Sequence, residues 1–252
     1  MVSNGVMPIW LEAGVWGFIA ASALLMGSLL GWFVRFSPKV IAHVMAFGSG
    51  ILVAALSFEL VEEARSHASI VWVAGGFMLG ATAFSLINHL LTSPGVRHRK
   101  RSQRQQPAAS NTGLAIAAGT LLDGIPESMA IGLLVASGGK LSLATVAAIF
   151  ISNIPEALSS TAGMRSAGRS GWFIMRLWGG IAVLSGLFAV VGTLFFGDAP
   201  PPIRALITCI AAGGIFAMVV ETMIPEAFAE THELSGLMAA LGFVVALAMQ
   251  TL

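Results

Sequence analysis

Two short motifs place acidic residues beside prolines in an otherwise apolar part of the chain. DGIPESMA begins at Asp123 and SNIPEALS begins at Ser152, and Ile, Pro and Glu recur at matching places in the two. Glu127 follows Asp123 by four residues, and Glu156 follows Ser152 by four. Residues four apart share one face of a helix, so each motif predicts a helix with a polar face.

The two motifs together supply the oxygen atoms of one candidate cation site. Carboxylate, amide and hydroxyl oxygens are ligands that suit a hard divalent cation. If the two predicted helices pack together, their polar faces bring three carboxylates, an amide and a hydroxyl to the same place. The candidate ligands are Asp123, Glu127, Ser152, Asn153 and Glu156. Glu221, in a later apolar segment, is a further candidate, because an acidic residue inside a membrane helix is costly and is functional by default.

The prolines predict a distortion of each helix next to the candidate ligands. A proline inside a helix lacks its N–H, and its ring displaces the carbonyl group four residues earlier. Pro126 therefore frees the carbonyl of Leu122, and Pro155 frees that of Ile151. We expect two kinks, with both freed carbonyl groups facing the polar cavity, where irregular backbone is tolerated at membrane depth.

The composition places the chain among integral membrane proteins. Of its 252 residues, 56% are hydrophobic and only 10% are charged, and the mean hydropathy is +0.87. Soluble domains carry about 25% charged residues. The single cysteine, Cys209, excludes an intramolecular disulfide and a site of several thiolates.

Apolar stretches of about 20 residues predict eight membrane-spanning helices. The chain is therefore expected to be an all-α polytopic membrane protein, with residues 1–252 forming a single transmembrane domain. The long basic connection at 93–111 is expected to be a flexible cytosolic loop. The predicted spans are 9–34, 40–61, 70–92, 113–136, 141–164, 172–196, 203–226 and 234–252.

The distribution of Lys and Arg predicts that both termini lie outside. One set of alternate loops carries ten of these residues, whereas the other set carries Arg65, Lys140 and Arg204. Positively charged loops stay in the cytosol. Glu226 lies near the predicted cytosolic exit, where ordinary loop charge is the simpler interpretation and a release site the alternative.

Weak internal repeats predict a three-plus-two-plus-three arrangement of the helices. The two IPE motifs lie on consecutive spans that run in opposite directions. The segment 50–64 resembles 214–228 at an offset of 164 residues, again on spans of opposite direction. Inverted repeats of this kind are typical of secondary transporters, whose substrate sites lie where the repeats meet.

The paired motifs resemble the H-N-x-P-E signatures of the ZIP (Zrt-, Irt-like) divalent metal transporters, and the resemblance extends along the whole chain as a divergent, bacterial-type member. It implies uptake of zinc, or of iron, manganese or cadmium, into the cytosol, and a location in the bacterial inner membrane. It also implies that Asp123, Glu127, Ser152, Asn153 and Glu156 are the metal ligands. Glu221 resembles a residue of the ion path.

The resemblance also fixes what we expect of cofactors and partners. The metal would be the transported substrate, with no prosthetic group, and the expected partners are the metal ion and the lipid bilayer, without nucleic acid. The chain could also form a homodimer. Aspartate stands at 123 where the family has histidine, and glycine stands at 124 where it has asparagine. These departures leave open which metal is carried and whether the site holds one ion or two.

Two other functions are compatible with the same carboxylates. One is an intramembrane metalloenzyme that activates water, although the chain has no H-E-x-x-H motif, and we expect no enzyme activity. The other is a proton-coupled transporter of an organic solute, which would need a larger apolar pocket. No phosphate-binding G-x-x-x-x-G-K-[ST] motif is present, which argues against an ATP-driven pump within this chain.

Overall fold

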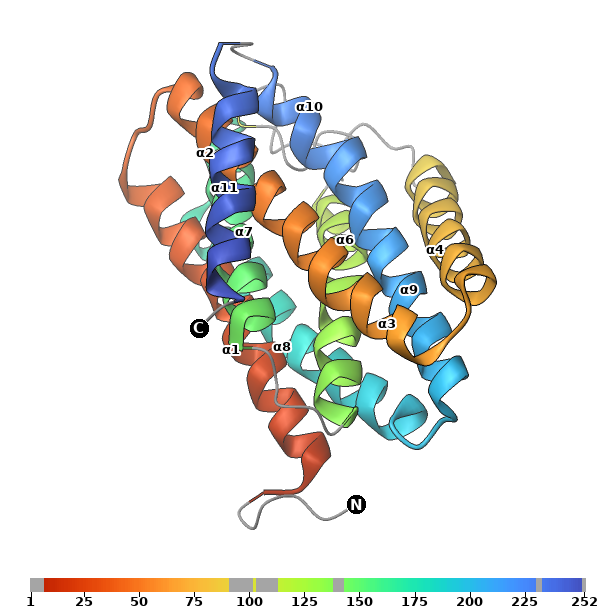
Figure 1. The fold of residues 1–252 in the computed structure, drawn as a ribbon. Helices are drawn as coiled ribbons and strands as arrows, with labels where there is room; N and C mark the ends of the chain where they lie inside the picture. Colours follow the sequence, from red (N-terminus) through yellow and green to blue (C-terminus); the bar gives the residue numbers. More distant parts are fainter. Residues whose placement is uncertain (1–6, 91–101, 103–112, 138–142, 230–232, 251–252) are drawn as a thin grey trace.

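A computed structural model of the chain describes residues 7–90, 102, 113–137, 143–229 and 233–250. The fold of these residues is a bundle of helices (Figure 1). The predicted loop at 93–111 lies outside the described residues, except for Ser102.

The described helices form eight rods, two of which contain a short π-helical segment. Each rod coincides with one of the eight predicted spans. The helices are α1 (Ile9–Phe33), α2 (Pro38–Ala55) continued by η1 (Leu56–Val61) and α3 (Glu62–His67), α4 (Ile70–Leu90), α6 (Gly113–Ala136), α7 (Leu143–Ser166), α8 (Gly171–Phe196), α9 (Pro201–Met218) continued by η2 (Val219–Met223) and α10 (Ile224–Ala227), and α11 (Ser235–Met249).

Six of the rods are long and apolar enough to cross a membrane, which defines a polytopic membrane protein. The exceptions among the described residues are α7, which carries the whole second motif, and α11, which has 15 residues. Many large apolar side chains stay exposed on the outside of the bundle, such as Phe33 (75%), Val71 (76%) and Phe195 (74%). Such an apolar surface suits contact with lipid tails better than contact with water.

Local sequence explains where several helices begin. Ser37 precedes Pro38, and its hydroxyl accepts a hydrogen bond from the Val40 N–H (3.4 Å). Proline fits the first turn of a helix because no N–H is needed there. Ser170 caps α8 in the same way, accepting from the Phe173 N–H (3.2 Å).

Two helix pairs form through backbone contact at glycines. α2 lies beside α11, and α4 lies beside α9 (Figure 1). A Cβ atom at Gly50 would collide with the Ala239 carbonyl group of α11, and one at Gly80 would collide with the Ile210 carbonyl group of α9. Gly242 and Gly213 meet the opposite helices of the same pairs just as closely. Small residues let helices approach in this way in membranes, where packing must replace the hydrophobic effect.

The other four helices, which belong to neither pair, form a group of their own: α1, α6, α7 and α8. α1 packs extensively against both α7 and α8, and α6 packs against α8. This group joins the two helix pairs along α2–α7 and α6–α9 contacts. α6 and α7, which carry the two motifs, touch each other only slightly. Instead of packing directly, α6 and α7 face each other across a pocket that side chains of α1 and α8 help to line.

The π-helical segments occupy similar places in two rods. η1 covers residues 56–61 and η2 covers residues 219–223. A shift of 164 residues, which is the offset of the predicted repeat, carries 56–61 onto 220–225. Short π segments are rare and often mark functional positions.

Candidate metal site

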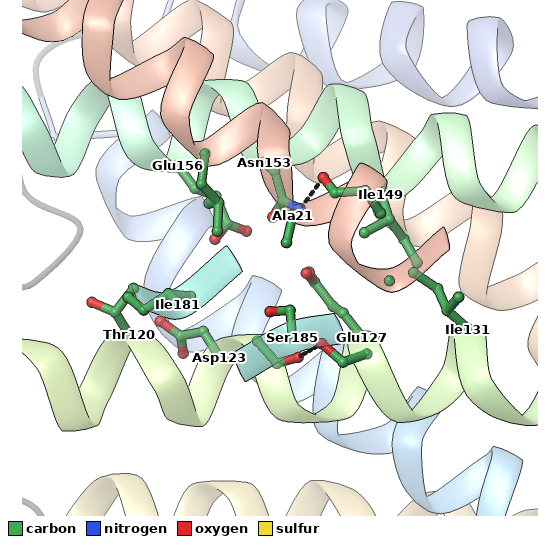
Figure 2. A pocket seen from close by; sticks show the side chains of 15 residues that line it. Ala21, Thr120, Asp123, Glu127, Ile131, Ile149, Asn153, Glu156, Ile181 and Ser185 are labelled. Atoms are coloured by element: carbon green, nitrogen blue, oxygen red, sulfur yellow. Dashed lines mark hydrogen bonds between the residues drawn. The ribbon is translucent and has the colours of Figure 1, made fainter. Parts of the chain in front are cut away.

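The first motif forms a polar stripe along α6. Thr120, Asp123 and Glu127 follow one another at intervals of three and four residues, so they share one face of the helix. Asp123 is 2% exposed and Glu127 is 4% exposed. Figure 2 shows both carboxylates directed from α6 into one pocket.

The second motif faces this stripe from α7. Asn153 and Glu156 are also buried, and they line the same pocket. The Asn153 amide nitrogen donates to the Ala20 carbonyl group of α1 (3.1 Å). This bond fixes the amide against α1, while Glu156 points across the pocket towards α6 (Figure 2).

Small and apolar side chains of α1 and α8 close the pocket between the two motifs. The space left inside is about 10 Å³, close to the room that a single water molecule needs. The walls from these two helices are Gly17, Ala20, Ala21 and Leu24 of α1, with Ile181 and Ser185 of α8. Three carboxylates so poorly exposed to solvent are costly unless cations or hydrogen bonds compensate them.

The structure brings together four of the six candidate ligands: Asp123, Glu127, Asn153 and Glu156. Ser152 is fully buried but does not line the pocket, and its hydroxyl donates to the Ile149 carbonyl group (2.9 Å). Its neighbour Asn153 takes the place that faces the site, since adjacent residues on a helix point about 100° apart.

Glu221 lies apart from this pocket, on η2 beside α4. The Asn88 side chain donates to its Oε2 (2.7 Å), and the Ser85 hydroxyl donates to its Oε1. The sixth candidate is therefore bonded to a neighbouring helix, and its part in an ion path stays a prediction.

The carboxylate groups that line the pocket are not arranged around one common position for an ion. Within the part of the chain that the structure describes, no three His, Cys, Asp or Glu side chains are grouped closely enough to hold an ion. The pocket therefore provides the donor types of a divalent cation site, and side-chain movement would have to bring the carboxylates together. Oxygen donors of this kind bind zinc, manganese, iron(II) or cadmium less selectively than sulfur donors would.

The two motif prolines face away from the pocket and pack on other helices. Pro126 packs on Gly214 of α9, where a Cβ would lie 3.2 Å from the proline Cγ. Pro155 packs on Gly48 of α2, where the corresponding distance is 2.7 Å. Both helices continue through their prolines.

The carbonyl groups that the prolines displace were expected to face the cavity. Neither Leu122 nor Ile151 lines the pocket. A displaced carbonyl lies on the face of the helix that carries the proline ring, and those faces contact α9 and α2. The prediction was wrong because it did not consider which face each proline occupies.

Sequence reasoning missed Thr120 and Ser185, two polar residues of the pocket. Thr120 could have been found, because it extends the stripe of Asp123 and Glu127 by three residues. Ser185 comes from α8, which has no acidic residue and no motif that points to the site.

Glu226 was interpreted as a loop charge, and the structure places it inside a helix instead. It is 2% exposed, and its Oε1 accepts from the Ser159 hydroxyl (3.0 Å) and the Ser102 N–H (2.7 Å). The sequence does contain a pattern that pointed to a buried acidic residue here, because Ile224, Pro225 and Glu226 form a third IPE sequence.

The buried polar pocket and the apolar helices define a class: a polytopic integral membrane protein with acidic groups at the centre of its helical bundle. No family model matches the chain. A segment of 213 residues, 83% of the chain, is 29% identical to a protein of Arabidopsis thaliana named "Putative zinc transporter". The match covers 33% of that protein, so the chain spans about a third of the length of the curated relative. Over most of its length the chain is thus similar to a protein that is named as a zinc transporter.

Proposed function

We propose that this protein transports divalent metal cations, zinc foremost, across a membrane. The proposal rests on one observation: Asp123, Glu127 and Glu156 project from two different helices into the same buried pocket. Ionisable groups inside a membrane protein typically mark the path of an ion. The similarity to a protein named as a zinc transporter supports the choice of cargo.

In this proposal the cation exchanges its water for protein oxygens. Asp123 and Glu127 bind it from the α6 side, and Asn153 and Glu156 bind it from the α7 side. The negative charge of the carboxylates offsets the cost of removing the ion from water. Ser152 has no direct contact with the metal in this scheme, since its hydroxyl is bonded within α7.

The proposed topology places both termini outside, in a bacterial inner membrane, with transport towards the cytosol. The asymmetry of Lys and Arg supports this orientation. The two π-helical segments, at places that match the 164-residue offset, support the three-plus-two-plus-three inverted repeat. The chain belongs with the ZIP transporters in this proposal, with the metal as substrate and no prosthetic group.

The proposal is tested by zinc uptake into proteoliposomes that contain the purified protein. Glu156→Gln removes one negative charge at nearly constant shape, and we expect uptake to fall to the level of empty vesicles. Glu62→Gln is the matched control, because the Glu62 side chain is 68% exposed at the end of the second rod. It should transport as the unmodified protein does.

Competition with cadmium, manganese and iron(II) in the same vesicles would rank the metals. Wild-type vesicles that take up none of these ions in either orientation would refute the transport proposal. Equal uptake by Glu156→Gln and Glu62→Gln would instead refute the assignment of the pocket.

A further inference from the structure

A second, chemically different pocket lies where α1 and α7 end. It is lined by Gly31, Val34, Arg35, Phe36, Ala162, Arg165 and Ser166, and its volume is about 310 Å³. Two arginines contribute to it, and no acidic residue is among its lining residues in the described part of the chain. It shares no lining residue with the carboxylate pocket. Its positive charge repels cations and favours an anion.

Arg165 is held in place by the end of α1. Its Nη1 donates to the Trp32 carbonyl group (2.6 Å) and, at 3.4 Å, to that of Gly31. The guanidinium also lies over the Trp32 ring, 5.9 Å from its centroid. A guanidinium carries five N–H donors in a planar fork. Among the described residues, both hydrogen bonds of Arg165 start from Nη1, which leaves the donors at Nε and Nη2 for a ligand.

The surroundings of this pocket have the composition of a membrane interface. Gly171, at the start of α8, packs against the Trp32 ring, where a Cβ would meet Cζ2 at 2.8 Å. The next residue, Trp172, is 71% exposed, and Arg176 lies over its ring at 5.3 Å. Tryptophan and arginine gather at the level of lipid headgroups.

An apolar surface leads from the pocket towards the lipid. Phe33 is 75% exposed and Val34 is 43% exposed, and Val34 also lines the pocket. A ligand in this position would meet guanidinium groups at one end and apolar side chains at the other.

We propose that this pocket binds the phosphate group of an anionic glycerophospholipid, through Arg35 and Arg165. Guanidinium groups bind phosphate through paired, charge-assisted hydrogen bonds. Basic pockets between helices at a membrane surface bind anionic headgroups. One acyl chain would lie along Phe33 and Val34. The inference depends on the membrane placement of the helices and is independent of the metal cargo.

The test is a titration of the purified full-length protein, in neutral detergent, with phosphatidylglycerol or with phosphatidylcholine of the same acyl chains. Binding is measured by native mass spectrometry and by the rise in the thermal unfolding midpoint. We expect phosphatidylglycerol to bind and stabilise the protein more than phosphatidylcholine does. Arg35→Gln should weaken phosphatidylglycerol binding about tenfold or more, because a hydrogen bond to a charged group is lost.

Arg204→Gln is the control, because Arg204 lies in a separate pocket with Glu63 and His67. It removes the same charge, and it should leave phosphatidylglycerol binding unchanged. Arg165→Lys is the second variant, since it keeps the charge near the end of α1 but loses the planar fork. It should weaken binding and keep the protein folded.

Three results would overturn the inference. The first is equal binding of the two lipids, and the second is equal loss in Arg35→Gln and Arg204→Gln. The third is full stabilisation by inorganic phosphate alone, at the concentrations at which phosphatidylglycerol acts, since the ligand would then be a free anion.

Discussion

Adding a single methyl group at Gly48 should disturb the helix that carries Glu156. An ideal Cβ at Gly48 lies 2.7 Å from Pro155 Cγ, whereas ordinary contacts begin at 3.4 Å. The two atoms must therefore separate by at least 3.4 − 2.7 = 0.7 Å. A change of ring pucker at Cγ can absorb part of this separation, and the rest needs a relative shift of α2 and α7. Such a shift would displace Glu156, which follows Pro155 directly in α7.

The size of the effect follows from the cost of overpacking. Inserting a methyl group into a tightly packed contact typically costs about 1–3 kcal/mol, which corresponds to about 5-fold to about 160-fold in an equilibrium. We expect Gly48→Ala to lower the thermal unfolding midpoint and to reduce zinc uptake by a factor in this range.

A graded series of variants gives the test its controls. At Gly214 the corresponding Cβ lies 3.2 Å from Pro126 Cγ, so a shift of only 0.2 Å is needed and a smaller effect is expected. At Gly75 and Gly179 no atom lies within 4 Å of the added Cβ. Alanine at these two positions should be neutral or slightly stabilising, because it favours helix over glycine by up to about 1 kcal/mol.

Thermal unfolding in detergent and zinc uptake into vesicles are measured on the same preparations. The reasoning is refuted if Gly48→Ala behaves like Gly75→Ala in both assays. It is also refuted if the variant at Gly214 is impaired more than the one at Gly48.

Three further variants test individual contacts. Asn153→Ala removes the hydrogen bond to the Ala20 carbonyl group. The variant should lose about 1–3 kcal/mol of stability, measured from the unfolding midpoint. It should also bind zinc more weakly in a competition titration. Trp178→Phe removes the buried N–H that donates to Thr161 Oγ1 (2.9 Å); it should destabilise the protein by about 1 kcal/mol or more without changing the metal ranking, and unchanged unfolding would contradict this. Glu221→Gln tests the predicted part of Glu221 in an ion path, although its carboxylate lies outside the pocket. Zinc uptake should fall in the stably folded variant, and unchanged uptake would exclude Glu221 from the path.

Hydropathy was sufficient to predict the helices, because spans of apolar residues follow directly from the thickness of a bilayer. The helix at 143–166 shows the limit of this signal. It carries enough Ser, Thr, Asn and Glu to fall outside the apolar spans found in the structure. The predicted span at 141–164 is nevertheless a helix, Leu143–Ser166. Its polar side chains face other helices rather than lipid.

The sequence did not fix the direction of individual side chains. Ser152 and Asn153 were both candidates, and only packing against α1 decides that Asn153 faces the pocket. The carbonyl groups freed by the prolines were expected to face the cavity because they neighbour the acids, although the proline rings contact Gly48 and Gly214 on other helices. Such choices depend on which helices are neighbours, and this information is not local in sequence.

The polarity of α7 has a consequence for how the protein is synthesised and inserted. A helix with Glu156 near its centre is a poor substrate for insertion on its own, because a charged residue there costs about 2.5–3.5 kcal/mol on insertion scales. The helices against which α7 packs most, α1 and α2, precede it in the chain. When the ribosome delivers α7, its partners have already been made, and they can receive its polar face as it enters the bilayer. The order of helices along the gene thus suits the assembly of a pocket that no single helix could carry into lipid.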